Sequence, residues 1–245
     1  MNEPLVLIPG LGCDSRLFET QTCRLGLDRV IILCLPVLSD RVEDMAARLL
    51  TRLPPKFALA GHCLGGAVAM EMLRLAPERV TRIAVISAAI LPEPTEVAAA
   101  RDLLIAKARG GRLDDALAEA LPVRALAQIP GRLNLHRRFL SMGDHLGLEH
   151  FVSQQRAMQR RPDNQATLRR ARLPALFLFG EADRLVPAGR NALLAELLPG
   201  ARIIVLSEAG HLPPLEQPDA VTAAMEHWLF GHDRQPLFRA QPGRI

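Results

Sequence analysis

"LAGHCLGGAVAM", residues 59–70, joins a short apolar run to a run with helical character. The apolar residues 57–60 are typical of a buried parallel strand, and the pattern over 66–76 predicts a helix that ends before Pro77. Between them, Cys63 has Gly61 and Gly65 two residues to either side. Because glycines let two backbones approach closely, this spacing predicts a sharp turn that lifts the sulfur above the sheet. The positive end of the following helix favours an anion, so we expect the Cys63 pKa to lie below the free value of ~8.5.

Apolar runs on both sides of this stretch predict a larger sheet. The predicted strands are residues 5–8, 30–35, 57–60, 82–87, 175–179 and 202–206. Helical patterns follow at about 40–50, 66–76, 187–198 and 218–229. Strands that alternate with helices favour right-handed crossovers, so we expect an α/β fold with a mostly parallel sheet flanked by helices. Residues 92–172 lack a convincing strand and are too long for a plain loop, which predicts a helical insertion.

The composition argues against several classes of protein. The chain has 245 residues, 49% of them hydrophobic, which is enough for one large core, and no apolar run approaches the ~18 residues of a membrane span. The first residues resemble no signal peptide. The four cysteines show neither metal-type spacing nor disulfide density, so we expect a cytoplasmic protein. We expect Cys34 in the core, Cys23 in helix packing and Cys13 in a loop near the pocket.

The net charge of +4 is concentrated in the predicted insertion. Residues 101–172 hold 14 basic and 7 acidic side chains. The arginines are scattered at helical spacing, and aromatic residues make up only 4% of the chain, so we expect solvated helix faces and no nucleic-acid partner. The alternative is a basic rim that attracts anionic substrates. Arg156, Arg160 and Arg161 are candidates for the mouth of such a pocket.

A base and an acid that could serve Cys63 follow two other predicted strands. His211 lies in SEAGHLPPLEQP after the sixth strand, and Asp183 lies in FGEADRLVP after the fifth. The carboxyl ends of parallel strands meet at one edge of a sheet, so we expect these three side chains to converge there. A nucleophile, a base and an acid that orients the base form a catalytic triad. The alternative, an inert buried cysteine, does not account for the paired glycines.

These motifs together resemble the α/β-hydrolase superfamily. The matches are Gly-x-Cys-x-Gly-Gly at 61–66 in place of the usual Gly-x-Ser-x-Gly elbow, Gly-x-x-Asp-x-x-x-Pro at 180–187, and Gly210-His211 with Glu216 and Pro218. The resemblance implies a three-layer core formed by residues 1–92 and 172–230, in a compact six-strand version. It further implies that residues 93–171 are a helical lid. We expect the tail, 231–245, to be loosely packed.

The resemblance also implies an oxyanion hole. In this family one donor is the backbone N–H after the nucleophile, here Leu64. The second comes from the loop after the first strand, which implies Leu11, with Gly12 as an alternative. The neighbouring Gly10 and Gly12, together with His62 beside the nucleophile, are candidates for substrate binding, although a packing role is more typical for His62.

The expected activity is hydrolysis without a cofactor. A thiolate leaves a tetrahedral intermediate more readily than an amine does, which disfavours amides and leaves small esters, thioesters and lactones as substrates. The proposed course is an acyl-enzyme on Cys63 followed by attack of water. Two alternatives stay open: transfer of the acyl group to another acceptor, and a catalytically weak binding protein or sensor on the same fold. The oligomeric state stays open.

The remaining polar motifs are assigned structural roles. Asp144, His145, Glu149 and His150 combine metal-ligand types at helical spacing, yet no partner cluster accompanies them, so we expect a solvated surface and no metal site. The pair Gly10 and Gly12 lacks the third glycine of a dinucleotide fingerprint. Glu216 is expected to orient the loop of the base.

Overall fold

The fold is one parallel sheet between two layers of helices. The computed structural model describes residues 3–35, 37–186 and 192–231. Six strands pair in parallel in the order β2-β1-β3-β4-β5-β6. They are β1 (Leu5–Ile8), β2 (Ile31–Leu33), β3 (Phe57–His62), β4 (Val80–Ile86), β5 (Ala175–Gly180) and β6 (Arg202–Leu206). The predicted α/β fold with a parallel sheet is confirmed.

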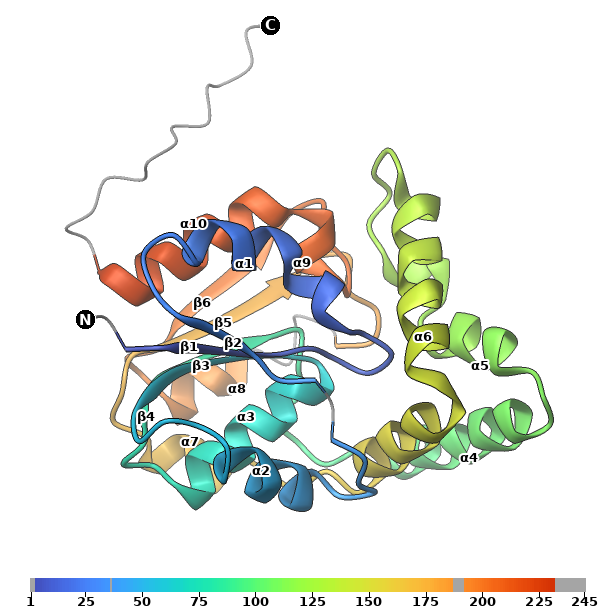
Figure 1. Ribbon diagram of the computed structural model, residues 1–245, viewed down its shortest axis with the longest axis horizontal. Helices are drawn as coiled ribbons and strands as arrows, with labels where there is room; N and C mark the ends of the chain where they lie inside the picture. Colours follow the sequence, from blue (N-terminus) through green and yellow to red (C-terminus); the bar gives the residue numbers. More distant parts are fainter. Residues whose placement is uncertain (1–2, 36, 187–191, 232–245) are drawn as a thin grey trace, which may run out of the picture.

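Helices cover both faces of this sheet (Figure 1). One face carries α1 (Glu19–Leu25), α9 (Pro213–Glu216) and α10 (Pro218–Phe230), with the short 3-10 helix η1 (Ser15–Phe18) before α1. The other face carries α2 (Val42–Leu50), α3 (Leu64–Leu75), α7 (Gln165–Arg170) and α8 (Ala192–Leu197). The described part of the predicted helix 187–198 is therefore helical, and residues 187–191 lie outside the described residues.

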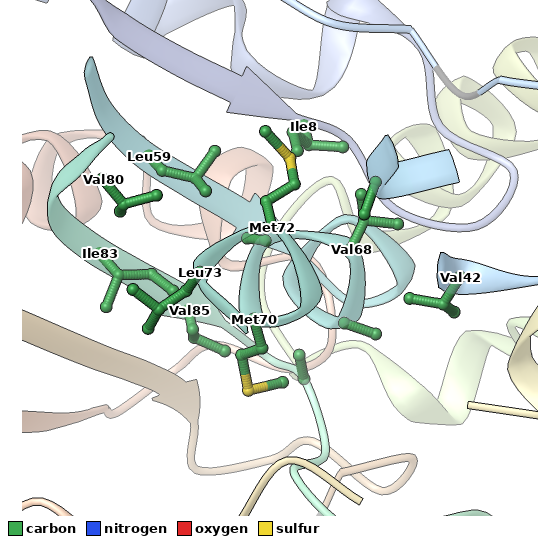
Figure 2. Close-up of a cluster of buried hydrophobic side chains, with 14 of the residues drawn as sticks. Ile8, Val42, Leu59, Val68, Met70, Met72, Leu73, Val80, Ile83 and Val85 are labelled. Atoms are coloured by element: carbon green, nitrogen blue, oxygen red, sulfur yellow. The ribbon is translucent and has the colours of Figure 1, made fainter. Parts of the chain in front are cut away.

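The core has two parts because successive strand residues point to opposite faces. In β1, Ile8 packs with the α3 side and Leu7 packs with the α1 and α10 side, and both are almost fully buried. Figure 2 shows Met72 and Leu73 of α3 among strand side chains of the first cluster, including Val85. Burying each side chain of this size contributes about 1.5–3 kcal/mol. The sheet is thus a firm base for the loops at its carboxyl ends.

A helical insert stands at one end of the sheet (Figure 1). It contains α4 (Thr95–Arg109), α5 (Leu113–Ala120), the 3-10 turn η2 (Val123–Ala125) and α6 (Arg132–Gln159). The long α6 is kinked at Gly147, whose φ of 82° is readily adopted only by glycine. Among the residues that the structure describes, no helix is long and apolar enough to cross a membrane.

Helix α7 falls within residues 93–171, the segment predicted to be a lid. Helix α7 packs against α3 and α8, and its Leu168, with the following Ala171, belongs to the core cluster on that face. The periodicity of an amphipathic helix shows that one face is buried, but it does not show which element that face packs against. The elements that stand away from the sheet are α4 to α6.

Two local predictions are corrected. The second strand is only Ile31–Leu33, and the flanking Val30 and Leu35 are exposed, because β2 is an edge strand with solvent on one side. Cys23 is exposed on α1, so its predicted packing role is wrong, whereas Cys34 is buried in the core as predicted. The predicted tail, apart from Gly231, lies outside the described residues.

Candidate active site

The candidate nucleophile lies at the turn between β3 and α3. Cys63 has φ 48° and ψ −113°, a conformation that is rare and strained for a residue with a side chain. The glycines around it are required by contact. A Cβ on Gly61 would lie 2.1 Å from the carbonyl oxygen of Gly65, and one on Gly65 would lie 2.1 Å from that of Ile8. The sequence pattern therefore reflects a real steric demand of this turn.

The candidate base and acid are in direct contact. His211 follows β6 and Asp183 follows β5, and Nδ1 of the ring lies 2.9 Å from Oδ2 of the carboxylate, with both groups buried. The other carboxylate oxygen accepts the backbone N–H groups of Leu185 and Val186 at 2.9 and 3.0 Å. Burial alone would raise the pKa of Asp183, but the His211 charge and these hydrogen bonds lower it. The acid is therefore an ionised acceptor that fixes the orientation of the ring.

The thiol and the imidazole interact as an ion pair would. Burial opposes charge on both groups, yet the His211 charge and its hydrogen bond to the sulfur lower the pKa of Cys63. The charges of Asp183 and Cys63 in turn raise the His211 pKa well above its usual value. Smaller contributions to the Cys63 shift come from Arg101 and from the backbone N–H of Leu11. Each of the two groups therefore favours the charged form of the other.

The loop that carries His211 is held by a buried carboxylate. Glu216 accepts backbone N–H groups from Ala127 at 2.7 Å, Gly210 at 2.9 Å and Leu212 at 2.8 Å. Burial raises the pKa of this carboxyl, against the lowering effect of the three N–H groups. Because Ala127 belongs to the insert, the Glu216 side chain joins the loop that carries His211 to the insert.

His62 stands beside the base and lines the cavity. Its Nε2 lies 2.7 Å from the carbonyl oxygen of His211, which requires a proton on Nε2. Burial and the charge of His211 lower the pKa of His62 to about 3, so the ring is neutral. Its hydrogen bond to the His211 carbonyl helps to hold the loop that carries the base. A Cβ on Gly10 would lie 2.4 Å from Nδ1 of this ring, so Gly10 provides room for His62.

The residues expected in the oxyanion hole and the pocket differ in whether they reach the cavity and in how their N–H groups are bonded. Leu64 is the first residue of α3, so its N–H has no acceptor within the helix. Leu11 lines the cavity, and its backbone N–H helps to lower the pKa of Cys63. Gly12 differs from expectation, because its N–H is donated to the side chain of Gln154 at 2.8 Å and the residue does not line the cavity. Gly10 also lies outside the lining.

A cavity of about 310 Å³ opens at Cys63 between the sheet and the insert. Most of its lining is apolar, from residues such as Ile90, Phe139 and Leu212. Polar lining comes from the following side chains: His62, Cys63, Ser87, Glu93, Arg101, Arg161, Arg184 and His211. Of the three arginines considered for the pocket mouth, only Arg161 is in the lining, whereas Arg156 pairs with Asp40 at 2.8 Å.

Ser87, Glu93, Arg101 and Arg184 are polar members of this cavity that sequence reasoning missed. Glu93 and Arg101 lie eight residues apart across the start of α4, a spacing typical of no motif. Ser87 follows β4 with φ 45°, and its Oγ is buried without a hydrogen-bond partner among the described residues. Its position at a carboxyl strand end was a usable signal.

Cys13, the other cysteine in this region, is inaccessible to solvent. Cys13 is fully buried, and burial together with the charge of Cys63 raises its pKa well above the usual value. It is therefore a neutral thiol near the candidate nucleophile. The described residues contain no group of three or more His, Cys, Asp or Glu side chains that could hold a metal ion.

Comparisons with known proteins agree with this architecture. A pimeloyl-[acyl-carrier protein] methyl ester esterase of Aromatoleum aromaticum is 28% identical, over 94% of this chain and all of that protein. A thermophilic esterase from Thermogutta terrifontis superposes with a TM-score of 0.82 at 23% identity, covering 94% of this chain and 90% of its own. An enol-lactonase from Burkholderia xenovorans also gives 0.82, at 21% identity, covering 94% and 92%. The profile of the alpha/beta hydrolase family matches residues 5–224, and this chain belongs to that family.

Proposed function

We propose that this chain hydrolyses small carboxylic esters, thioesters or lactones through Cys63, His211 and Asp183, without a cofactor. The observation that carries the proposal is the buried hydrogen bond between Asp183 and His211, next to a thiol whose pKa His211 lowers. The similarity to ester-hydrolysing relatives supports the reaction class. The helical insert would act as a lid over the cavity.

The first half-reaction forms a thioester. The thiolate of Cys63 attacks the carbonyl carbon, and the carbonyl π electrons move to oxygen. The N–H groups of Leu64 and Leu11 would stabilise that oxyanion, for which each donor typically accounts for about 10²–10³ in rate. As the oxyanion collapses, the bond to the leaving oxygen or sulfur breaks. Imidazolium of His211 gives its proton to the leaving group and becomes neutral.

The second half-reaction restores the enzyme. Neutral His211 takes a proton from water as the water oxygen attacks the thioester carbon. The second tetrahedral intermediate collapses with Cys63 as the leaving group, which regenerates the thiolate–imidazolium pair and releases a carboxylic acid. Asp183 stays ionised throughout and holds the ring in the tautomer that both steps require.

The experiment is turnover of p-nitrophenyl acetate by the whole chain and its variants. Cys63→Ala and His211→Ala are expected to lose at least about 10³-fold in kcat/KM, as removal of triad members typically does. Cys23→Ser is the matched control, because Cys23 is an exposed thiol outside the site. Unchanged turnover in both site variants rules the mechanism out. Added thiol or alcohol acceptors in the same assay detect acyl transfer as a new ester product.

A further inference from the structure

The wall of the cavity formed by the insert holds a buried charged cluster. Glu93 binds Arg101 through two hydrogen bonds and Arg161 through one of 2.6 Å. The side chains of Glu93 and Arg161 are only 3% and 5% exposed, and that of Arg101 is 17% exposed. All three line the cavity. Two guanidinium groups share one carboxylate, which leaves this wall with a net charge of +1.

The cluster has donors to spare. A guanidinium carries five N–H bonds. Toward the described residues, Arg101 uses three of these, two on Glu93 and one on the Gln155 side chain at 2.6 Å. Arg161 uses two, on Glu93 and on the backbone carbonyl of Leu91. The Gln155 side-chain nitrogen is fully buried and has no acceptor among the described residues. Gln155 is not part of the cavity lining, so the spare N–H groups of Arg101 and Arg161 are the ones that can donate to a further anionic group in the cavity.

The buried positive charge of the cavity lies at the insert end. At the triad end the Asp183 carboxylate is paired with His211, and the exposed Arg184 also lines the cavity. The insert end carries the +1 of the arginine cluster, and apolar side chains line most of the rest. Inside a low-dielectric cavity the positive charge of the insert end attracts an anionic group of a substrate.

We propose that Arg101 and Arg161 bind a carboxylate of the substrate, so that the preferred substrates are small esters or thioesters carrying a carboxylate a few carbons from the reacting carbonyl. The inference rests on the proposed function and names its substrate class. Arg101 and Arg161 are specificity-determining residues in this account. If Arg101 served only to stabilise the Cys63 thiolate, its substitution would lower turnover of neutral and anionic substrates equally.

The test compares matched esters that differ in one charge. The first pair is the p-nitrophenyl half-ester of glutaric acid and p-nitrophenyl pentanoate, which places the carboxylate on the acyl group. The second pair is O-acetylglycolate and the neutral O-acetylglycolamide, followed by proton release, which places the carboxylate on the leaving group. We expect the wild type to prefer the anionic member of at least one pair, which also identifies the side that carries the charge.

Substitution of Arg101 should remove that preference. Charge-assisted hydrogen bonds of this kind account for about 10- to 100-fold in binding, so Arg101→Gln should lower the anionic-to-neutral ratio of kcat/KM by that factor. Arg101→Lys, which keeps the charge, should lower the ratio less. Arg156→Gln is the matched control, because Arg156 is also an insert arginine paired with a carboxylate but lies outside the cavity lining. No preference in the wild type, or an equal loss on both members of a pair, overturns the proposal.

A measurement without turnover separates this inference from the proposed function. The Cys63 peptide is quantified by mass spectrometry after reaction with iodoacetate or with neutral iodoacetamide. We expect glutarate to protect Cys63 of the wild type from iodoacetamide, and glutaramide not to. We expect Arg101→Gln to lower the iodoacetate-to-iodoacetamide ratio. Equal protection by both compounds contradicts anion binding even if Cys63 hydrolyses esters, whereas selective protection supports it even if Cys63 does not. The wild-type comparison decides the matter should Arg101→Gln fail to fold.

Discussion

Replacing Glu216 by glutamine tests how the base is held in place. One oxygen of Glu216 accepts the N–H groups of Ala127 and Gly210, and the other accepts that of Leu212. A glutamine keeps one oxygen, so its best orientation retains two bonds and turns an NH₂ group toward the third N–H. The loss of one charge-assisted bond and one buried donor left unsatisfied together cost about 2–4 kcal/mol.

The assay for Glu216→Gln is thermal unfolding combined with ester turnover. For a chain of this size we expect Tm to fall by about 5–15 °C, because 1 kcal/mol corresponds to roughly 2–4 °C. Turnover should fall as well, since His211 lies between two of the three backbone groups that Glu216 binds. Glu208→Gln on the same segment is exposed and serves as the matched control. A Tm within about 1 °C of the wild type would refute the reasoning.

Three further outcomes follow from the site. Gly61→Ala places a Cβ 2.1 Å from a carbonyl oxygen of α3, so it should lower the free energy of unfolding, measured in urea, by more than ~2 kcal/mol. Gly200→Ala is the control, because open space surrounds Gly200 and the free energy of unfolding should change little. Equal effects of the two substitutions would count against the tight turn. The alkylation rate of Cys63 should titrate at a pH below ~8.5, and His211→Ala should move that midpoint upward, since the imidazole lowers the thiol pKa; an unmoved midpoint contradicts the pairing. Asp183→Asn should lower kcat by about 10²–10⁴ with a normal Tm, because the amide binds the wrong tautomer of the ring; wild-type kcat would contradict its role.

Much of the fold and the contact between Asp183 and His211 could be predicted because the signals are local. Gly61 and Gly65 predict a turn at which only glycine fits. The apolar runs predict the strands that Asp183 and His211 follow. Parallel strands then bring those positions to one edge without further information. The role expected for Glu216 is confirmed by its three backbone hydrogen bonds.

The insert side of the cavity could not be predicted, because its contacts depend on how helices cross. Glu93 lies in the segment before α4, Arg101 in α4 and Arg161 just after α6, and only tertiary packing brings them together. The same packing explains why Gly12, a candidate from its loop position, gives its N–H to Gln154. Helical periodicity reports that a face is buried and does not name the partner.

The most direct test of the central claim is the mass of the intact protein after rapid acid quench of its reaction with a p-nitrophenyl ester. We expect the mass to increase by one acyl group on the Cys63 peptide. Hydroxylamine should release this group as it releases a thioester, and Cys63→Ala should not acquire it. An acyl group on another residue, with undiminished ester turnover by Cys63→Ala, would contradict the central claim.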